Sequence, residues 1–313
     1  MKLLFSLIFC FSFLFSQQLK PLHTYLASGG VTDLVLKDNL LYIATANSAV
    51  DIFDTQSHEL IKSIKMPKIK DFVGDIINAK VYSIDVLNDR IIIVSQGEHG
   101  FRTIYEYTDE KLNPLITIEK KMYIAKAKYI NDNQIILSLL SNQLFLFDIK
   151  QKKLLWEKQV SQSKFSDFAL NEDKSKVIIA DESGSLKAIE TKTGKLKKIY
   201  SGVNVDNIFQ VDIKKGVIIT AGQDRRCAIY DKFNQYYKKA EFLIYSAGLS
   251  PSGKIAGYAN NEENDVTLFD TKSKKELYTL RGHKMTLSNI LFKNEKELYT
   301  SSDDNEVYYW KIN

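Results

Sequence analysis

Short runs of alternating hydrophobic and polar residues fill most of the chain, which is the pattern of half-buried β-strands. One order of runs recurs: an alternating stretch such as residues 31–36, a continuous apolar stretch such as residues 41–44, and a further alternating stretch that ends on a large residue. Turn-forming residues such as Asp38-Asn39 and Pro251-Ser252-Gly253 separate the runs. No segment with helical periodicity competes with them, so the pattern predicts an all-β protein.

The large residue that ends the third stretch returns at a nearly constant interval. Successive copies lie 54, 40, 42, 41, 39 and 41 residues apart. The seven copies are Phe53, Tyr107, Phe147, Ile189, Tyr230, Phe269 and Trp310. A repeat of about 40–45 residues built from short strands is typical of the blade of a β-propeller. We therefore expect a seven-bladed β-propeller.

The blades are expected at about residues 31–65, 80–120, 124–158, 165–200, 207–241, 243–280 and 287–313. The last of these has room for only three strands. Residues 20–26 resemble the fourth-strand sequence at residues 276–282 and also lead into the start of a blade. We expect residues 20–26 to pair with the last blade and close the ring, because closure removes an exposed sheet edge.

The first sixteen residues have a different character from the rest. One lysine is followed by an apolar run, and polar Gln17-Gln18 comes next, which is typical of a secretory signal peptide at residues 1–16. The propeller then occupies residues 17–313, in an exported, soluble, periplasmic protein. Cys10 loosely resembles a lipoprotein cysteine, but Phe9 stands where such a site needs a small residue. After removal of the leader, Cys227 is the one remaining cysteine, so no internal disulfide is expected.

The last blade resembles a WD40 repeat, whose signature is a Gly-His pair and a terminal Trp. Gly282-His283 and Trp310 match it. The resemblance implies a buried structural tetrad of His283, Thr300, Asp304 and Trp310: Asp304 accepts from the His283 ring, His283 holds the Thr300 hydroxyl, and this hydroxyl meets the indole N–H. A role inside the blade is a sufficient reason for these residues, and no catalytic residue is assigned.

Composition and motifs exclude several classes of function. The formal charge of +5 is spread over scattered lysines, without the basic stripe of a nucleic-acid-binding protein. No nucleophile motif or phosphate-binding loop occurs. The four histidines fall in segments that the ring would place apart, so no metal site is expected. Turns such as Thr193-Gly194-Lys195 are similar to those of quinoprotein propellers, but their repeated Trp and carboxylate-rich calcium sites are missing. We expect no cofactor.

Two connections are longer than their counterparts and are the favoured places for partner binding. They are the interblade segment at residues 66–79 and the blade-two turn at residues 97–102. Exposed aromatic residues and arginines are enriched in interface hot spots. The candidate partner-binding residues are Lys68, Lys70, Phe72, Phe101, Arg102, Arg225, Arg226 and Arg281. Ordinary solvated turns are the alternative.

Over its full length the chain resembles the NapL family, exported WD40-like accessory proteins of the periplasmic nitrate reductase system. The resemblance rests on the leader, on residues 27–36 and 41–54, and on the final blade. It implies a non-enzymatic scaffold that binds the molybdenum-containing catalytic subunit or its assembly factors. No stretch after the leader is long and apolar enough to span a bilayer, so we expect no stable membrane insertion. The alternatives are a ligand-binding or enzymatic propeller that uses its central funnel, and an outer-membrane assembly scaffold.

Overall fold

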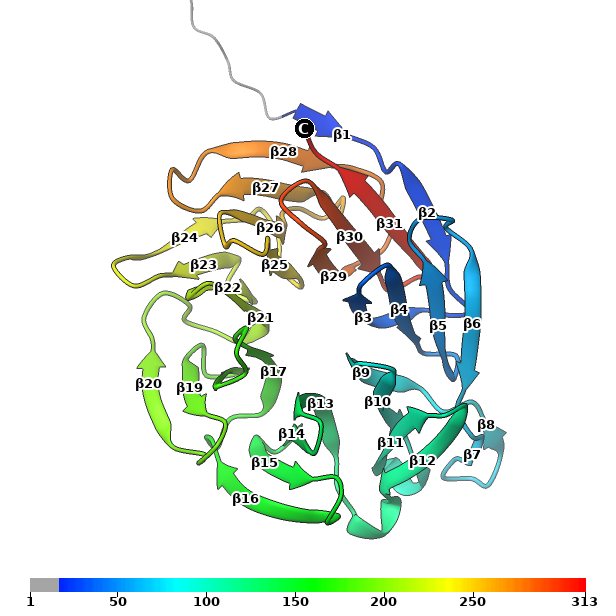
Figure 1. Ribbon diagram of the computed structural model, residues 1–313. Coiled ribbons are helices and arrows are strands. Elements are labelled where there is room, and N and C mark those ends of the chain that lie inside the picture. The colour runs from blue at the N-terminus through cyan, green and yellow to red at the C-terminus, as the bar shows by residue number, and fades with distance from the viewer. Residues whose placement is uncertain (1–16) are drawn as a thin grey trace, which may run out of the picture.

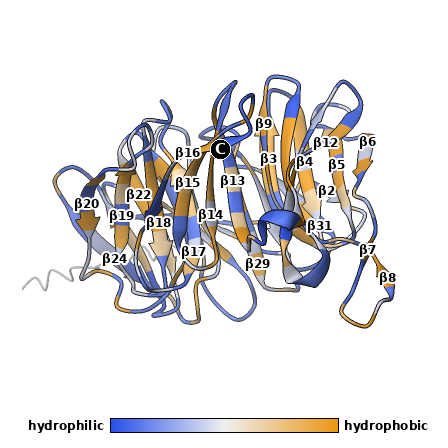
Figure 2. Ribbon diagram, turned by 90° about the horizontal axis from the view of Figure 1, so that it is seen from below, coloured by the Kyte–Doolittle hydropathy of each residue, from blue (hydrophilic) through white to orange (hydrophobic). Residues whose placement is uncertain are grey.

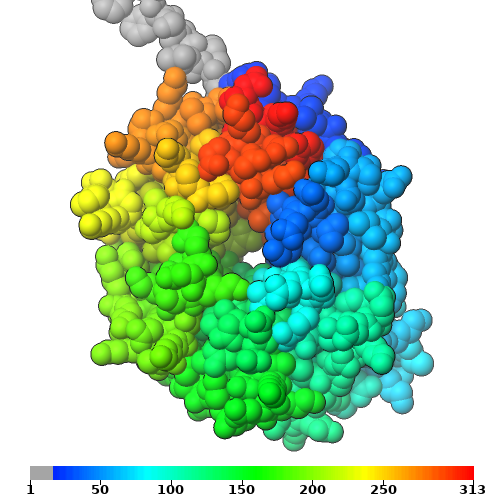
Figure 3. Space-filling view, in the orientation of Figure 1, coloured from blue at the N-terminus to red at the C-terminus, as the bar shows by residue number. Residues whose placement is uncertain are grey.

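The computed structural model describes residues 17–313, and the expected leader with Cys10 lies outside them. Seven antiparallel sheets form a ring around a central opening (Figures 1 and 3). In each sheet the first strand faces the centre and later strands follow outward in chain order, except where an N-terminal strand is added at the rim. The predicted seven-bladed β-propeller is confirmed.

Blade one consists of β3 (Val31–Lys37), β4 (Leu40–Thr45), β5 (Ala49–Asp54) and β6 (Leu60–Lys65), and blade two of β9 (Val81–Leu87), β10 (Arg90–Gln96), β11 (Arg102–Thr108) and β12 (Lys111–Ile116). Blade three consists of β13 (Ile124–Asn131), β14 (Gln134–Leu139), β15 (Gln143–Asp148) and β16 (Lys153–Gln159), and blade four of β17 (Phe165–Leu170), β18 (Lys176–Asp181), β19 (Leu186–Glu190) and β20 (Leu196–Tyr200). Blade five consists of β21 (Ile208–Lys214), β22 (Val217–Gly222), β23 (Arg226–Tyr230) and β24 (Gln235–Lys239), and blade six of β25 (Ala247–Leu249), β26 (Ile255–Ala259), β27 (Val266–Asp270) and β28 (Glu276–Leu280). Blade seven contributes β29 (Leu287–Phe292), β30 (Glu297–Ser302) and β31 (Glu306–Lys311). Two 3-10 helices, η1 (Glu98–Gly100) and η2 (Ile118–Lys120), flank β11 and β12.

The hydrophobic core lies between neighbouring blades. Most second and third strands are buried on both faces, because each blade packs against the next, and this explains their continuous apolar runs. Six of the seven repeat-defining residues are buried, and Tyr107 is partly buried. One such cluster joins Ile92 and Val94 of blade two to Tyr129 and Leu137 of blade three.

The N-terminal segment closes the ring as expected. β2 (His23–Leu26) pairs antiparallel with β31, with Tyr25 opposite Val307. Tyr25 is 1% exposed and packs edge-on against Phe53 of blade one. The sequence did not indicate a further strand, β1 (Gln17–Leu19), which pairs parallel with β28 and adds a fifth strand to blade six.

The ring has two faces with different connections. Loops leading from one blade to the next, together with the turns between second and third strands, lie on one face, named here the interblade face. The predicted long segment between blades one and two folds into a two-stranded hairpin, β7 (Ile69–Lys70) and β8 (Ile76–Ile77). Figure 2 shows this hairpin projecting beyond the body of the ring.

Candidate functional site

The residues expected to form the tetrad lie together in the core of blade seven. The Trp310 indole N–H donates to Thr300 Oγ1 at 2.7 Å, and His283 Nε2 lies 2.6 Å from the same hydroxyl. His283 is 5% exposed, and burial lowers its pKa to about 4, against a smaller opposing effect of Asp304. The ring is therefore neutral at neutral pH.

The prediction that Asp304 accepts a hydrogen bond from the His283 ring is wrong, because Ser302 lies between the two side chains. Ser302 Oγ is 3.1 Å from His283 Nδ1 and donates to Asp304 Oδ1 at 3.0 Å. Since Ser302 uses its proton on Asp304, His283 carries its proton on Nδ1, and Nε2 accepts from Thr300. Every donor then has an acceptor, which is the condition for burying such a chain of polar groups.

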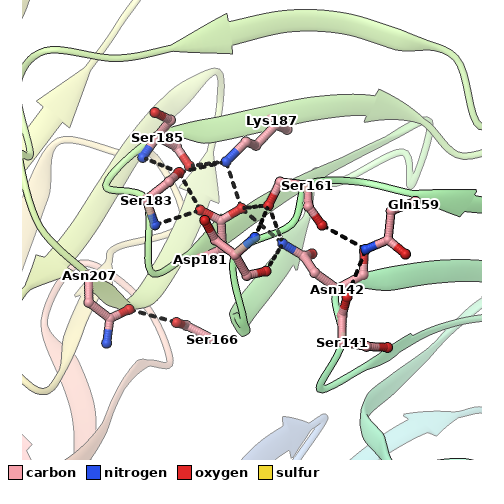
Figure 4. Close-up of polar contacts among 11 residues, drawn as sticks. Ser141, Asn142, Gln159, Ser161, Ser166, Asp181, Ser183, Ser185, Lys187 and Asn207 are labelled. Atoms are coloured by element: carbon pink, nitrogen blue, oxygen red, sulfur yellow. Dashed lines mark hydrogen bonds and ion pairs between the residues drawn. The ribbon is translucent and has the colours of Figure 1, made fainter.

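Two other blades contain the same kind of polar link. Ser161, Asn204 and His283 each stand four residues before an inner-strand start. In blade five, Asn204 accepts from Thr220 Oγ1 at 2.7 Å. In blade four, Ser161 donates to Asp181 at 2.7 Å, and Lys187 Nζ lies 2.6 Å from the same carboxylate (Figure 4).

Asp181 is wholly buried and belongs to the polar link of blade four. Asn142 of the preceding blade also donates to it at 2.9 Å (Figure 4). Burial acts to raise the pKa of Asp181, but Lys187 and the Ser183 and Ser161 hydroxyls outweigh it and hold the pKa below its usual range. The link therefore joins blades three and four, and the Asp181 carboxylate is engaged in structural bonds.

The tip of the β7–β8 hairpin carries the most exposed apolar side chains of the interblade face. Phe72 is 81% exposed, Val73 83% and Ile76 68%. The tip is held by Asp71, whose Oδ1 accepts from the backbone N–H groups of Val73 and Asp75, each at 2.9 Å. Two strong turn bonds therefore present these apolar groups to solvent in a defined arrangement.

The blade-two turn lies against this hairpin. A Cβ placed on Gly100 would lie 3.6 Å from both Phe72 Cζ and Tyr123 Cε1, so the two rings flank the same glycine. Phe101 packs on Tyr123 with ring centroids 5.1 Å apart. The two long connections thus form one apolar surface, named here the hairpin patch: Phe72, Val73, Ile76, Phe101 and Tyr123.

The remaining candidate residues are distributed over the interblade face. Lys68 and Lys70 are exposed beside the hairpin patch. Arg225 is exposed in the blade-five turn, whereas Arg226 donates to the Val203 carbonyl at 2.7 Å. Arg281 donates to Asp265 at 3.1 Å, near the boundary of blades six and seven.

Arg102 does not point toward the hairpin patch. It is the first residue of β11, and its guanidinium lies 3.5 Å from the centre of the Tyr82 ring, beside the central channel. Strand alternation accounts for this, since consecutive residues point to opposite sides and Phe101 takes the outer one. The grouping of Arg102 with Phe101 on one docking surface is corrected accordingly.

Two rings of polar side chains line the channel, and the sequence reasoning missed them. The register shifts early in the inner strand of blades one to five and seven, so that the next side chain is turned toward the axis. This first ring contains Asp33, Ser83, Lys126, Asp167, Gln210 and Asn289. Two positions further along, the second ring contains Asp85, Lys128 and Asp212. The sequence signal that could have predicted these rings is the presence of isolated polar residues at inward positions of the inner strands.

Carboxylates of the two rings connect neighbouring blades. Asp33 accepts from the Ile84 N–H at 2.9 Å, and Asp167 accepts from the Val211 N–H at 3.1 Å. In the second ring, Asp85 accepts from Tyr129 at 2.8 Å and Asp212 from Leu249 at 3.1 Å. Each bond links one inner strand to the next, where no sheet ladder exists.

Lysines balance these carboxylates. Lys126 Nζ lies 2.6 Å from Asp167, Lys214 Nζ lies 2.9 Å from Asp212, and Lys128 is shared between Asp33 and Asp85. Burial opposes the charge of Lys126, but Asp167 and Asp33 outweigh it and raise the pKa of this lysine. Burial raises the pKa of Asp85 in spite of Lys128. The channel is thus a polar cavity whose charges are mainly paired.

Two chambers succeed each other along the channel. One of 230 Å³, named here the interblade chamber, is lined by the early residues of the inner strands together with Arg102. The other, of 380 Å³, lies toward the opposite face and includes Asp85, Lys128, Asp212 and Lys214. Asp33, Lys126, Asp167 and Gln210 border both chambers.

The expected separation of the histidines is wrong for one pair. His23 of β2 and His58 of blade one stack with ring centroids 4.1 Å apart, because the N-terminal strand closes the ring beside blade one. The Tyr25 hydroxyl lies 2.6 Å from His58 Nδ1. Across residues 17–313, no group of three or more His, Cys, Asp or Glu side chains is arranged to hold a metal ion.

The helices of the described chain lack the length and apolar character that crossing a membrane requires.

Comparisons with known proteins identify the fold of this chain but do not assign it to a family. No family model matches the chain. An uncharacterised protein of Rickettsia conorii (RC0314) is 23% identical over 195 residues, covering 59% of this chain and 44% of that protein, so the chain spans less than half of that relative's length. The β-propeller domain of Myceliophteria thermophila Cps50 (Swd1) matches with a TM-score of 0.74 at 12% identity, over 94% of this chain and 99% of that one. The chain is thus a seven-bladed, WD40-like β-propeller.

Proposed function

We propose that this protein is a non-enzymatic periplasmic scaffold that binds a protein partner through the hairpin patch. The observation that carries the proposal is the exposure of Phe72 and Val73, at 81% and 83%, on a hairpin fixed by Asp71. Large apolar side chains held out on a stiff element lose little conformational freedom on binding, so their burial goes largely into affinity.

The surroundings of the hairpin patch favour a protein over a membrane as the partner. Lys68 and Lys70 are accompanied by Asp71, Asp75 and Glu98, and the Lys70 N–H lies 3.4 Å from a Glu98 carboxylate oxygen. A membrane-binding surface would combine apolar groups with an excess of cations. An apolar centre with a mixed polar rim is the composition of a protein interface.

The proposed partner is the catalytic subunit of the periplasmic nitrate reductase, or one of its assembly factors. This part of the proposal rests on the resemblance to the NapL family. We propose no catalytic role for His283 and Asp304, because both are bonded within the blade through Thr300 and Ser302.

A pull-down with matched variants tests the scaffold proposal. The tagged protein is recovered from the periplasm of nitrate-grown cells as the unaltered chain, as Phe72→Ser/Val73→Ser, and as Phe233→Ser. Phe233 is 82% exposed in the turn between β23 and β24, so it matches Phe72 in exposure but not in place. We expect the double variant to lose the nitrate reductase component by at least about tenfold, because an aromatic hot spot commonly contributes about 2 kcal/mol or more.

The outcomes separate the alternatives. Equal recovery with the unaltered chain and the double variant would exclude the hairpin patch as the docking surface. Recovery of outer-membrane assembly components in place of a nitrate reductase component would support the outer-membrane scaffold. Loss of the partner with Phe233→Ser as well would indicate nonspecific adhesion.

A further inference from the structure

Arg102 is a partly buried cation at the wall of the interblade chamber. Its Nη1 donates to the Ile124 carbonyl at 2.7 Å, and its plane lies over the Tyr82 ring at 3.5 Å. Burial lowers the pKa of this guanidinium. The Ile124 carbonyl and Tyr82, through its ring face and its hydroxyl, occupy only part of its capacity, because a guanidinium carries five N–H donors.

Other arginines placed against the body of the ring have an acidic partner. Arg90 pairs with Glu106, Arg226 with Asp224 and Arg281 with Asp265. Among residues 17–313, no carboxylate lies within ion-pair distance of Arg102. A charge removed from water without a counter-charge is costly, so an anion from outside the chain would stabilise this site.

Two residues that line the interblade chamber have hydroxyls without a hydrogen-bond partner. Ser83 is 2% exposed, and its hydroxyl has no hydrogen-bond partner within the described residues. The buried Thr32 hydroxyl is likewise without a partner there. Both hydroxyl oxygens are shielded from the chamber, so the guanidinium of Arg102 is the donor without a counter-charge that lines it.

The carboxylates at the chamber are already occupied. Asp33 accepts from the Leu34 and Ile84 N–H groups, each at 2.9 Å, and Asp167 accepts from Lys126 and the Val211 N–H. They therefore offer little to a cationic ligand. Two carboxyl groups at the same chamber also disfavour a ligand that carries more than one negative charge.

We propose that the interblade chamber binds a small monocarboxylate, with its carboxylate on Arg102. A planar carboxylate fits the fork of a guanidinium, which donates two parallel hydrogen bonds to it. Ala125, Leu140 and Phe165 supply an apolar wall for a short body. The 230 Å³ of the chamber corresponds to about eight water molecules, which limits the ligand to a small one. This site is independent of the hairpin patch.

Titration of the purified full protein by calorimetry tests the proposal. The probes are formate, acetate and benzoate, with benzamide as the neutral match of benzoate and sulfate as a dianion. We expect at least one carboxylate to bind, and sulfate and benzamide to bind at least about tenfold more weakly. Arg102→Gln keeps a donor for the Ile124 carbonyl and should weaken carboxylate binding by about 10- to 100-fold. Arg102→Lys should weaken it by a smaller factor, because it keeps the charge but loses the two parallel donors.

Arg226→Gln is the matched control. Arg226 also donates to a backbone carbonyl at 2.7 Å, but it pairs with Asp224 and does not line the chamber. Its substitution should leave the Kd for carboxylates unchanged. Failure of all three carboxylates to bind, or unchanged affinity in folded Arg102→Gln, would overturn the proposal. Where Arg102→Gln does not fold, Arg102→Lys decides: an affinity equal to that of the unaltered chain counts against the site.

Discussion

At the scale of single residues, one position of the blade forms the same kind of polar link with three different side chains. Four residues before an inner strand, His283, Asn204 and Ser161 each link to hydroxyls or carboxylates of their blade. The Gly-His and Trp residues made the blade-seven version predictable from the sequence. Ser302 was missed because a serine in a strand has no signature of its own, and only the fold shows that it separates His283 from Asp304.

His283 should make the stability of the protein depend on pH. Its pKa is about 4 in the folded protein against 6.5 in an unfolded chain, so the unfolded state binds more protons between these values. The contribution of this ring to stability is therefore lost as the pH falls from about 7 toward 4, by about 3 kcal/mol. His283→Asn, which copies Asn204 of blade five, should show a shallower decline over this window.

Urea unfolding at a series of pH values measures this difference. The comparison is between the slopes of unfolding free energy against pH, since the variant is expected to start about 1 kcal/mol lower at pH 7. Carboxylates such as Asp181 and Asp212 contribute to both proteins and cancel in the comparison. Parallel curves for the two proteins would show that His283 does not carry the acid sensitivity.

At the scale of elements, the N-terminal strands close the ring unequally. β2 makes a four-residue ladder with β31 and buries Tyr25 against Phe53. β1 pairs only three residues with β28, and its side chains are largely exposed. The closure by β2 was predictable because residues 20–26 resemble a fourth strand. The pairing of β1 was not, since three residues, of which only Leu19 is partly buried, are too few to show a pattern.

Stepwise deletion should distinguish the two strands. Removal of residues 17–19 should lower the free energy of unfolding by about 1 kcal/mol or less, because few buried groups are lost. Removal of residues 17–26 should destabilise the whole ring by more than about 3 kcal/mol, since loss of a single buried aromatic side chain already costs about that amount.

Denaturant unfolding of these shortened forms gives the test. A single cooperative transition at a lower midpoint is expected for the longer deletion, because an open ring exposes both neighbouring blades. An unchanged midpoint after removal of residues 17–26 would show that β2 is an appendage and does not close the ring.

At the scale of the whole molecule, repetition explains what the sequence revealed and what it concealed. Seven residues at a nearly constant interval defined the ring, because each marks the end of the same local order of strands. The channel depends on side chains that meet across blades, such as Asp167 with Val211, 44 residues apart. The stacking of His23 on His58 likewise follows from ring closure. The two long connections in the sequence indicated part of the hairpin patch. Their contact at Gly100 is visible only in the folded structure.

The most direct test of the proposed scaffold is site-specific photo-crosslinking in nitrate-grown cells. A photoreactive phenylalanine analogue is placed at position 72 or, as the matched control, at position 233, because both native side chains are more than four-fifths exposed. The proposal predicts an adduct with a nitrate reductase component from position 72 and none from position 233. Adducts from position 233 alone, or from neither position while the protein is folded and exported, would contradict docking through the hairpin patch.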